Sequence, residues 1–578
     1  MDFFRHLHIL APFFRRRWPL YSLGIAVLIV VDLLQLVIPR LTGQAVDLLV
    51  AGDAGLGSLL ALMAAIALLI AGLRYLYREL LMGTTRHLEF FLRERLFNHA
   101  VRLPLSYFDQ RGPGQLMALT LNDITAVRVA VGLGVLLLVD AVIQGLVSFF
   151  VMAKFINWQL TWQAVLPLPF VLFFTAVLGR PMHERFKRVQ EKFALLTEFA
   201  QETFAGARVI KGFAAEPAAI DRFTDVSRQS VGANLSLARL QAAYTPVTHI
   251  LPIFGYAIAL GTGGRLIMDG IITIGDLTAF IGYLSLLIWP VTGFSYLVAT
   301  VQRGSASLTR MAELLEQPAY ETGLPAAPAA LPAADISIRH LTYSYPGSEV
   351  LVLRDVSLTV PAGAVVGIVG RTGAGKSTLL RLLLRLYDPP AGAIFIGGAE
   401  IHTIDYLTLR QNIGYVPQDS QLFARTIGEN IAFAGEYSRP AVIAAARAAA
   451  VEEDIDSKPL GFGTVLGEKG RRLSGGQQQR VAIARALVKE PPILLLDDVF
   501  AALDYATQNA LLANMRQISG GRTTIIVSQR VAAVKGADTI IVIEDGAIAE
   551  QGSHQELVAG GGLYYRLYEQ QLAGGDEP

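Results

Sequence analysis

The sequence contains no cysteine, and this absence excludes several kinds of chemistry at once. Disulfide bonds, thiolate metal sites and cysteine nucleophiles all require a thiol. None of them can stabilise this chain or supply its reactive group. The sequence therefore carries no signal about the redox state of its compartment.

Charged residues are also scarce. They make up 17% of the 578 residues and sum to a net charge of +1, whereas hydrophobic residues make up 53%. This balance is more apolar than that of an ordinary soluble domain, which indicates membrane-buried surface. The near-zero net charge argues against a nucleic-acid partner, because phosphate backbones are bound by strongly basic surfaces. The length exceeds what one core organises, so several domains are expected.

Six apolar runs lie before about residue 300, and each is near the ~20 residues that a helix needs to cross a bilayer. The predicted spans are residues 19–38, 59–73, 132–153, 161–179, 246–266 and 277–300. The second and fourth are short, and the even total supports them. Two segments between spans keep apolar residues at helical spacing, so these helices are expected to continue roughly 30 Å beyond the membrane.

Arginine and lysine are distributed unevenly around the predicted spans. They gather before the first span and in the long connections after spans two and four, while the opposite loops hold only Lys154 and Arg265. Basic residues accumulate on the cytoplasmic side of membrane proteins. We therefore expect a multi-pass protein of the cell (plasma or inner) membrane with both termini and the C-terminal domain in the cytoplasm. Trp158 and Trp162 fit the outer aromatic belt.

The composition changes after residue 316. Residues 317–334 contain four prolines and many alanines without a strand or helix pattern, which is typical of a linker. Beyond them, short β-branched runs alternate with helical stretches, which predicts a mostly parallel α/β domain. The expected organisation is a transmembrane domain over residues 1–316, a linker over 317–334 and an α/β domain over 335–578.

A glycine-rich loop follows the predicted strand 365–369 and precedes a helical pattern. It reads Gly370, Arg371, Thr372, Gly373, Ala374, Gly375, Lys376, Ser377 and then Thr378. The G-x-x-x-x-G-K-S spacing in this context predicts a P-loop, whose backbone N–H groups wrap the phosphates of a nucleotide. Lys376 is expected to reach the β- and γ-phosphates and Ser377 to hold Mg²⁺.

A buried strand over residues 493–497 ends in a second candidate magnesium ligand, Asp497. A carboxylate at the end of such a strand completes a magnesium site on the side opposite Ser377. The next residue is Asp498, where hydrolysis would favour a longer carboxylate.

The pentapeptide Leu473, Ser474, Gly475, Gly476, Gln477 completes a set of motifs. With the P-loop and the Asp497 strand it resembles the nucleotide-binding domain of ABC transporters. The whole chain is similar to one half of an exporter-type ABC protein: an α-helical six-span transmembrane domain followed by an α/β P-loop NTPase domain of ABC type. The resemblance implies ATP and Mg²⁺ as cofactors.

The same resemblance assigns further roles. Tyr345 would stack on adenine, Gln418 would sense the γ-phosphate and Mg²⁺, and residues 501–504, ending in Asp504, would cross between two ATPase domains. Ser474 to Gln477 would contact ATP bound by the other chain, at the positive end of a helix. For Arg480 we favour a solvated helix charge over a phosphate contact. Segments near 112–123 and 207–216 would dock on ATPase domains.

Two residues depart from the family pattern. Asp498 stands where the family has glutamate as general base, and Gln529 stands where it has histidine. Aspartate is shorter by roughly 1.5 Å, and a misplacement of about 1 Å costs on the order of 100-fold in rate. Glutamine cannot carry the charge of an imidazolium. We therefore expect a slow ATP site of its own and a heterodimer with a second half-transporter that has the consensus glutamate and histidine.

Polar residues interrupt two predicted spans. Asp32 with Gln35, and Asp140 with Gln144, each form a polar stripe on one helix face. A charge in the membrane costs at least ~2.5 kcal/mol on insertion scales, so these aspartates should not face lipid. They either bond between helices or line a substrate cavity.

The predicted activity is ATP-driven export of an amphiphilic or hydrophobic substrate, whether drug-like, lipid or peptide. An importer on the same fold and an ATP-gated channel or regulatory membrane subunit are the alternatives. A free soluble ATPase is incompatible with six spans, and membrane lipid is an expected partner.

Overall fold

The computed structural model describes residues 6–319, 331, 335–467, 470, 472–500, 507–508, 511, 513–514 and 519–573. The chain divides into two compact units. One unit comprises residues 1–103 and 111–319, and the other comprises residues 104–110 and 320–578. Most of the predicted linker, residues 317–334, lies outside the described residues.

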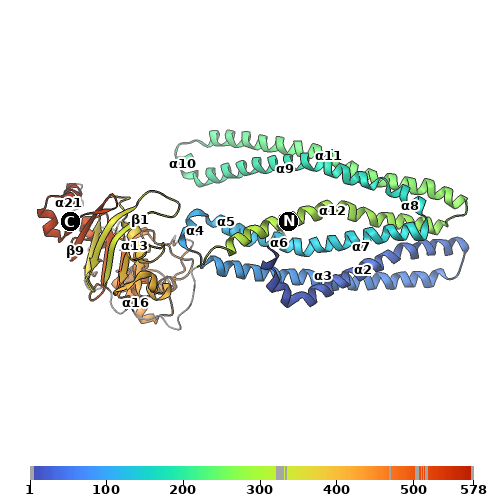
Figure 1. The fold of residues 1–578 in the computed structure, drawn as a ribbon. Helices are drawn as coiled ribbons and strands as arrows, with labels where there is room; N and C mark the ends of the chain where they lie inside the picture. Colours follow the sequence, from blue (N-terminus) through green and yellow to red (C-terminus); the bar gives the residue numbers. More distant parts are fainter. Residues whose placement is uncertain are drawn as a thin grey trace. The chain divides into compact units, whose positions relative to one another are not determined.

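Long helices make up the first unit (Figure 1). After the single turn η1 (Leu7–Ile9), its main segments are α2 (Ala11–Ala51), α3 (Leu56–Ala100), a continuous segment over Pro113–Ile156, α9 (Leu168–Ala205), α11 (Glu216–Met268) and α12 (Ile274–Leu315). The segment Pro113–Ile156 is made of α5 (Pro113–Ala118), η2 (Leu119–Asp123), α6 (Ile124–Val129), η3 (Ala130–Gly134), α7 (Val135–Val151) and η4 (Met152–Ile156). Each predicted span falls within one of these segments except the fourth.

Three helical segments in the described part of the chain are long and apolar enough to cross a membrane, namely α2, α3 and Pro113–Ile156. Two shorter apolar stretches, Ile253–Met268 and Ile274–Ile288, lie in α11 and α12. All of these stretches coincide with predicted spans. The helices themselves run far beyond the apolar cores, because their polar ends need no lipid.

The predicted fourth span is not one helix. The short α8 (Trp158–Val165) ends before Leu166 and Pro167, and α9 begins at Leu168. Pro167 has no N–H to continue the hydrogen-bond ladder, and Pro169 lies just inside the new helix, where proline is tolerated. Proline therefore divides a stretch that hydropathy alone presents as continuous.

The crossing of α2 and α12 is a backbone-to-backbone contact. A Cβ atom added to Gly43 would lie 2.3 Å from the carbonyl oxygen of Gly275, and the reverse distance is 2.2 Å. One turn further along α2, Asp47 accepts hydrogen bonds at 2.7 Å from the Gly275 N–H and from the Thr273 hydroxyl. The small residues allow the approach, and Asp47 satisfies the free N–H at the start of α12.

Helices α9 and α11 pack along each other (Figure 1) and are joined by the short α10 (Ala207–Gly212). We refer to residues 180–240 of this pair as the helical arm. Large apolar side chains of the arm are exposed, among them Phe186, Phe193, Phe204, Val209, Phe213, Ile220 and Leu235. Phe204 is 79% exposed and Phe213 is 82% exposed. Side chains of this size are rarely left uncovered in such number on a monomer.

The second unit contains two sheets. The smaller is antiparallel, in the order β2 (Leu353–Val360), β1 (Ile336–Tyr343), β4 (Ile394–Ile396), β5 (Ala399–Glu400). The larger has the order β10 (Ala547–Gly552), β9 (Thr539–Glu544), β3 (Val365–Val369), β8 (Thr523–Ser528), β7 (Ile493–Asp497), β6 (Ile413–Val416). Every neighbouring pair from β9 to β6 is parallel, as the alternating sequence pattern predicts.

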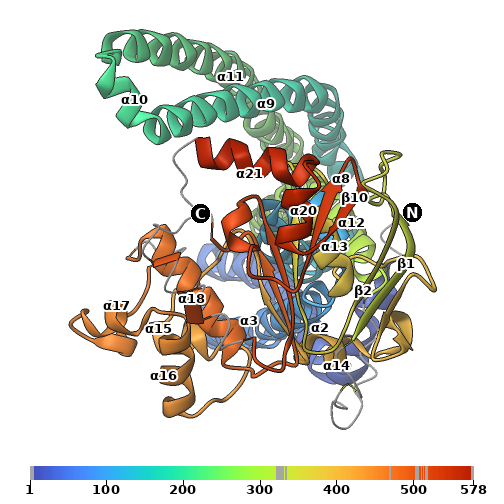
Figure 2. The ribbon, with the colours of Figure 1, turned by 90° about the vertical axis from the view of Figure 1, so that its left-hand side faces the viewer.

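The helices of this unit include α13 (Lys376–Leu383), α14 (Tyr406–Gln411), α15 (Ile427–Ile431), α16 (Arg439–Ala448), α17 (Glu452–Asp456), α18 (Gly475–Leu487), α20 (His554–Ala559) and α21 (Leu563–Ala573). Some of these helices cover the larger sheet, and α15 to α18 form a group at one side of it (Figure 2). The strand β7, which lies between β8 and β6, is buried at every position. A fully buried strand is the expected state of a parallel sheet covered on both faces.

A short helix from the N-terminal half of the chain also belongs to this unit. It is α4 (Leu105–Gln110), whose Asp109 accepts a hydrogen bond from the hydroxyl of Tyr387. The docking element was predicted near 112–123, and α4 lies immediately before that range. The sequence could not single out α4, because its six residues carry no motif.

We expect Gly43→Ala to destabilise the helical unit. The added methyl overlaps the Gly275 carbonyl and must push α2 and α12 apart, and overpacking of this kind costs about 1–3 kcal/mol. The melting temperature of the detergent-solubilised protein should fall.

Gly72→Ala is the matched control, because Gly72 lies within α3 with no atom within 4 Å of an added Cβ. An equal loss of melting temperature in both variants would contradict the close helix crossing.

Candidate functional site

The P-loop lies between β3 and α13, as the sequence predicts. Gly370, Gly373 and Gly375 have φ values of 158°, 86° and 97°, in the region that favours glycine. A Cβ on Gly370 would lie 2.2 Å from the Ile543 carbonyl oxygen, and one on Gly375 would lie 2.8 Å from that of Val352. The loop is therefore a cradle of bare backbone at the start of a helix, which fits a nucleotide phosphate.

Lys376 is the buried cation of this cradle. Its side chain is largely covered, and its ammonium donates to the carbonyl oxygens of Gly370 at 2.8 Å and Arg371 at 2.9 Å. Burial lowers the pKa of Lys376, and the nearby Asp498 and Asp497 partly offset this. The loop thus holds the ammonium within the cradle that phosphates would enter.

Ser377 and Asp497 lie together, although 120 residues separate them in the sequence. The Ser377 hydroxyl donates to Asp497 Oδ1 at 2.8 Å, and the Tyr415 hydroxyl lies 3.5 Å from Oδ2. Burial raises the pKa of Asp497, because it removes the carboxylate from water. A hydroxyl and a buried carboxylate are the hard oxygen donors that Mg²⁺ prefers, so these residues fit the metal.

Asp498 and Gln529 contact each other. Asp498 follows β7 with a φ of 48°, and its N–H donates to the Val527 carbonyl of β8 at 2.8 Å. The Gln529 side-chain amide lies 3.3 Å from Asp498 Oδ2, and the Ser528 hydroxyl lies 3.4 Å from Oδ1. Asp498 is buried, at 7% exposure. Both departures from the family pattern therefore belong to one polar cluster.

Gln529 also reaches the P-loop. Its side-chain oxygen accepts a hydrogen bond from the Thr372 hydroxyl at 3.1 Å. The glutamine thus lies between the loop and Asp498, with its side-chain oxygen toward Thr372 and its amide nitrogen toward Asp498. Neither sequence position by itself indicates this bridge.

Tyr345 lies beside α13. Its hydroxyl is 2.9 Å from the Thr378 hydroxyl, and Arg381 donates to it at 3.3 Å. Its ring meets the ring of Tyr387 edge-on, with centroids 4.9 Å apart. Tyr387 in turn bonds Asp109 of α4, so the predicted adenine contact adjoins the helix contributed by the N-terminal half of the chain.

Gln418 is exposed two residues after β6, next to the strand that ends in Asp497. Two residues of α18 that sequence reasoning missed hold its loop. Gln479 accepts from the Ser420 hydroxyl at 2.8 Å, and Arg485 donates to the Gln421 carbonyl at 3.0 Å. Burial lowers the pKa of Arg485. The sequence shows only that both residues lie in the helix after the signature, and this does not identify the residues that they contact.

The signature residues begin α18. Ser474 is its N-cap, and Ser474 and Gln477 form a reciprocal capping box. Gln477 also donates to Asp454 at 2.7 Å. Ser474 and Gly475 are exposed, and the added Cβ of Gly475 would meet no atom within 4 Å. The N-terminus of this 13-residue helix is therefore open to a ligand held by another surface.

Arg480 is not the solvated charge that we favoured from the sequence. Its guanidinium pairs with Asp454 at 2.7 Å and donates to the Ala450 carbonyl, and its side chain is 12% exposed. The partners come from α17 and the loop before it. A helical position alone could not reveal them.

The fold therefore gathers the P-loop, Ser377, Asp497, Asp498 and Gln529 at one edge of the sheet, with Tyr345 and Thr378 beside them. The signature lies at the start of α18. The predicted crossing loop, residues 501–504 with Asp504, lies outside the described residues.

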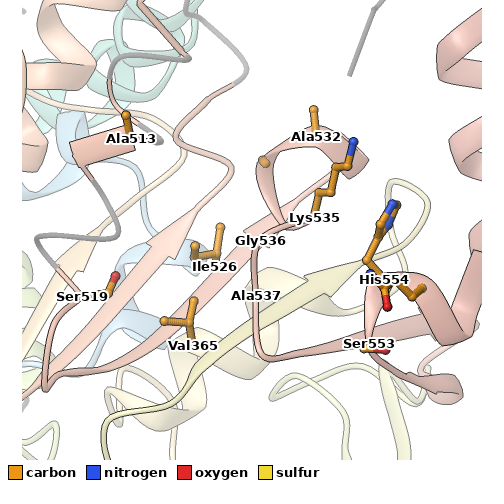
Figure 3. A pocket seen from close by; sticks show the side chains of 12 residues that line it. Val365, Ala513, Ser519, Ile526, Ala532, Lys535, Gly536, Ala537, Ser553 and His554 are labelled. Carbon is orange, nitrogen blue, oxygen red and sulfur yellow. The ribbon is translucent and has the colours of Figure 1, made fainter.

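A cavity of about 660 Å³ lies elsewhere in the same unit (Figure 3). Val365, the first residue of β3, lines it together with Lys535 and His554. Burial and the neighbouring Lys535 lower the pKa of His554. The P-loop follows the opposite, carboxyl end of β3, where ligands of parallel sheets bind, so this cavity is not part of the site.

Comparisons with known proteins agree with this geometry. Residues 21–291 match the family described as "ABC transporter transmembrane region", and residues 353–501 match the family described as "ABC transporter". The chain is 37% identical over 575 residues to the "Probable multidrug resistance ABC transporter ATP-binding/permease protein YheI" of Bacillus subtilis, covering 98% of each chain.

Two further relatives and one solved structure are similar. The chain is 35% identical to the "Multidrug resistance-like ATP-binding protein MdlA" of Escherichia coli, covering 97% of this chain and 96% of the relative. It is 36% identical to an "ATP-dependent lipid A-core flippase" of Aromatoleum aromaticum over 83% of this chain and 80% of the relative. The "Structure of a bacterial Atm1-family ABC exporter with ATP bound" matches with a TM-score of 0.78 and 28% identity, covering 96% and 98% of the two chains.

These matches cover nearly the whole chain and therefore both units. They confirm the predicted fold class, a helical transmembrane domain followed by an ABC nucleotide-binding domain. The chain belongs to the ABC transporter family, as an exporter-type half-transporter with a fused ATP-binding domain.

Proposed function

We propose that this chain is one half of a heterodimeric exporter in which its own P-loop holds ATP with little hydrolysis. Its signature completes a fast site on a second chain, which carries the consensus glutamate and histidine. The main observation behind this proposal is the contact between Asp498 and Gln529. This contact engages the carboxylate that stands at the general-base position.

The geometry of Asp498 supports slow hydrolysis. A general base must lie within hydrogen-bonding reach of the attacking water. Asp498 is shorter than glutamate by roughly 1.5 Å, and Gln529 and Ser528 lie beside its two oxygens. Gln529 cannot supply positive charge to a developing phosphate oxyanion. The position of the Asp498 carboxylate and the lack of positive charge at Gln529 are therefore both unfavourable for hydrolysis at this chain's own ATP site.

The rest of the site is suited to binding. Lys376 and the backbone N–H groups of the cradle would bind the phosphates of ATP. Ser377 and Asp497 would hold the metal, with Gln418 nearby, and Tyr345 would contact adenine. Because Asp497 loses water on burial, a bound cation would offset that desolvation. Tight retention with slow turnover follows from an intact cradle beside a weak base.

Two features favour assembly with a second chain. The N-terminus of α18 is exposed, so the signature is free to meet a phosphate on another surface. The helical arm also carries exposed apolar side chains that need cover. An apolar surface outside the membrane is the usual mark of an interface.

We further propose that substrate is an amphiphile moved out of the cell, with both termini and the ATPase domain in the cytoplasm of a plasma or inner membrane. The arginine-rich connections support this orientation. Trp158 and Trp162 stack with centroids 6.5 Å apart and are exposed, which fits a membrane interface. The multidrug and lipid A-core names of the relatives favour an amphiphilic substrate.

Transport against a gradient tests the activity itself. Inside-out vesicles containing the assembled complex should accumulate a fluorescent amphiphile in an ATP-dependent way, to a concentration above that outside. A channel would only equilibrate the probe, and an importer would not load these vesicles, so either result would contradict export.

We expect Asp498→Glu to raise the ATPase rate of the purified chain at least about tenfold, because the longer side chain reaches the attacking water. Steady-state phosphate release measures this. Asp498→Asn has the same length as the native residue but no base, and it should show no gain. A native chain that hydrolyses ATP rapidly in isolation would refute the slow-site proposal.

We expect Gly475→Asp to reduce the ATPase rate of the assembled complex by on the order of 100-fold, since loss of one oxyanion contact has that scale. The new carboxylate would repel the partner-bound γ-phosphate. ATP binding by this chain should be unchanged, because an acidic residue in the first helical turn is favourable.

The exposed Gly463 gives a control outside the helix start, where an added side chain also meets no atom within 4 Å. Gly463→Asp should leave the rate near that of the native complex. An unchanged rate in Gly475→Asp would mean that the signature does not serve catalysis.

A further inference from the structure

The polar residues that interrupt two predicted spans meet inside the helical unit. The side-chain amide of Gln144 on α7 donates to Asp32 Oδ1 on α2 at 2.9 Å. The predicted hydrogen bonding between helices is therefore confirmed for Asp32 and Gln144. Asp140, one turn before Gln144, brings its carboxyl within hydrogen-bonding reach of the Asp32 carboxyl.

One oxygen of this arrangement is left without a donor. Asp32 is 1% exposed, and its Oδ2 atom makes no hydrogen bond to any residue that the structure describes. A buried carboxylate oxygen without a donor costs free energy, and the cost grows when a second carboxyl lies beside it. Two adjacent carboxylates do not both ionise in such a place, so one positive charge is needed between them.

The surrounding residues do not supply that charge. Arg74 of α3 acts on both aspartates electrostatically, but it is exposed, and no ion pair joins it to either of them among the described residues. From α12, Tyr283 approaches one turn beyond Asp32, and its hydroxyl donates to the Leu36 carbonyl at 2.8 Å. From α7, Gln144 is neutral. The pair is thus short of one cation.

Asp32 and Asp140 differ in how accessible they are from outside the helical unit. Asp32 is enclosed at 1% exposure, whereas Asp140 is only partly buried, so the open side of the pair is that of Asp140. Ser148, two turns beyond Asp140 on the same face of α7, adds a fully buried hydroxyl without a hydrogen-bond partner in the described structure. A small polar group can therefore reach the pair from the side of Asp140.

We propose that Asp32 and Asp140 form a binding site for a single positive charge within the transmembrane domain. In the resting state the charge is a proton shared by the two carboxyls. The cationic group of an amphiphile displaces it: one O–H bond breaks, the proton passes to water, and the cation takes its place without any redox step. The inference rests on the proposed function only in treating such an amphiphile as substrate.

Hexyltrimethylammonium is a suitable probe, because it is amphiphilic, has a compact and permanently charged head group, and carries no exchangeable proton. Its binding to the full chain in phosphatidylcholine nanodiscs is followed by calorimetry, without ATP. Repeating the titration in buffers of different ionisation enthalpy counts the protons released. The expected result is about one proton released for each cation bound, as one shared proton requires.

Asp32→Asn and Asp140→Asn should each abolish proton release and weaken binding at least about tenfold, the scale of one close charge pair. An asparagine at position 32 still accepts from Gln144, so the interhelical bond is kept. Asp53→Asn, in the loop between α2 and α3, is the matched control and should behave like the native chain. If Asp32→Asn fails to fold, Asp140→Asn decides.

Binding without proton release, no binding of the probe, or release that survives in Asp140→Asn would each overturn the proposal. The assay needs neither hydrolysis nor transport. A fast ATPase in the isolated chain would therefore refute the slow-site proposal and leave the cation site standing. Binding without proton release would refute the cation site and leave the slow-site proposal standing.

Discussion

The parallel register of β3, β8 and β7 is the constraint on which the site depends. Val369 pairs with Ser528, and Asp497 pairs with Val527. The P-loop, the Asp497–Asp498 pair and Gln529 therefore all emerge at the carboxyl edge of one sheet. A shift of one residue in β7 would turn Asp497 away from Ser377, because successive side chains on a strand face opposite sides. The buried Ile493–Leu496 run anchors the register.

The proposed difference between the two ATP sites also arises at this carboxyl edge of the sheet. Asp498 leaves β7 in a left-handed conformation and meets Gln529 as that residue leaves β8. The two substitutions are therefore neighbours in one hydrogen-bonded cluster that extends to Thr372 of the P-loop. The signature on α18 is unaffected by this cluster, since its capping box and its contact with Asp454 are complete within the domain. Binding, catalysis and partner recognition are thus separable on this chain.

The sequence could predict elements that carry their own local signal. Glycine spacing and a preceding β-branched run located the P-loop, and hydropathy located the apolar cores of α2, α3 and α7. It could not predict contacts that depend on two distant segments, such as Arg480 with Asp454 or the Gln418 loop with Arg485. The fourth span is divided into two helices, which a window of apolar residues does not predict because it does not register that Pro167 interrupts the hydrogen-bond ladder. The polar stripes were found, but only the packing of α2 on α7 shows which atoms meet.

The central claim is that ATP remains at this chain's P-loop while the partner's site turns over. The most direct measurement isolates the complex with its native partner during steady-state turnover and determines, by photocrosslinking labelled nucleotide to each chain, what each P-loop holds. The account predicts ATP on this chain and a mixture of ATP and ADP on the partner. ADP on this chain in the same proportion as on the partner would contradict it.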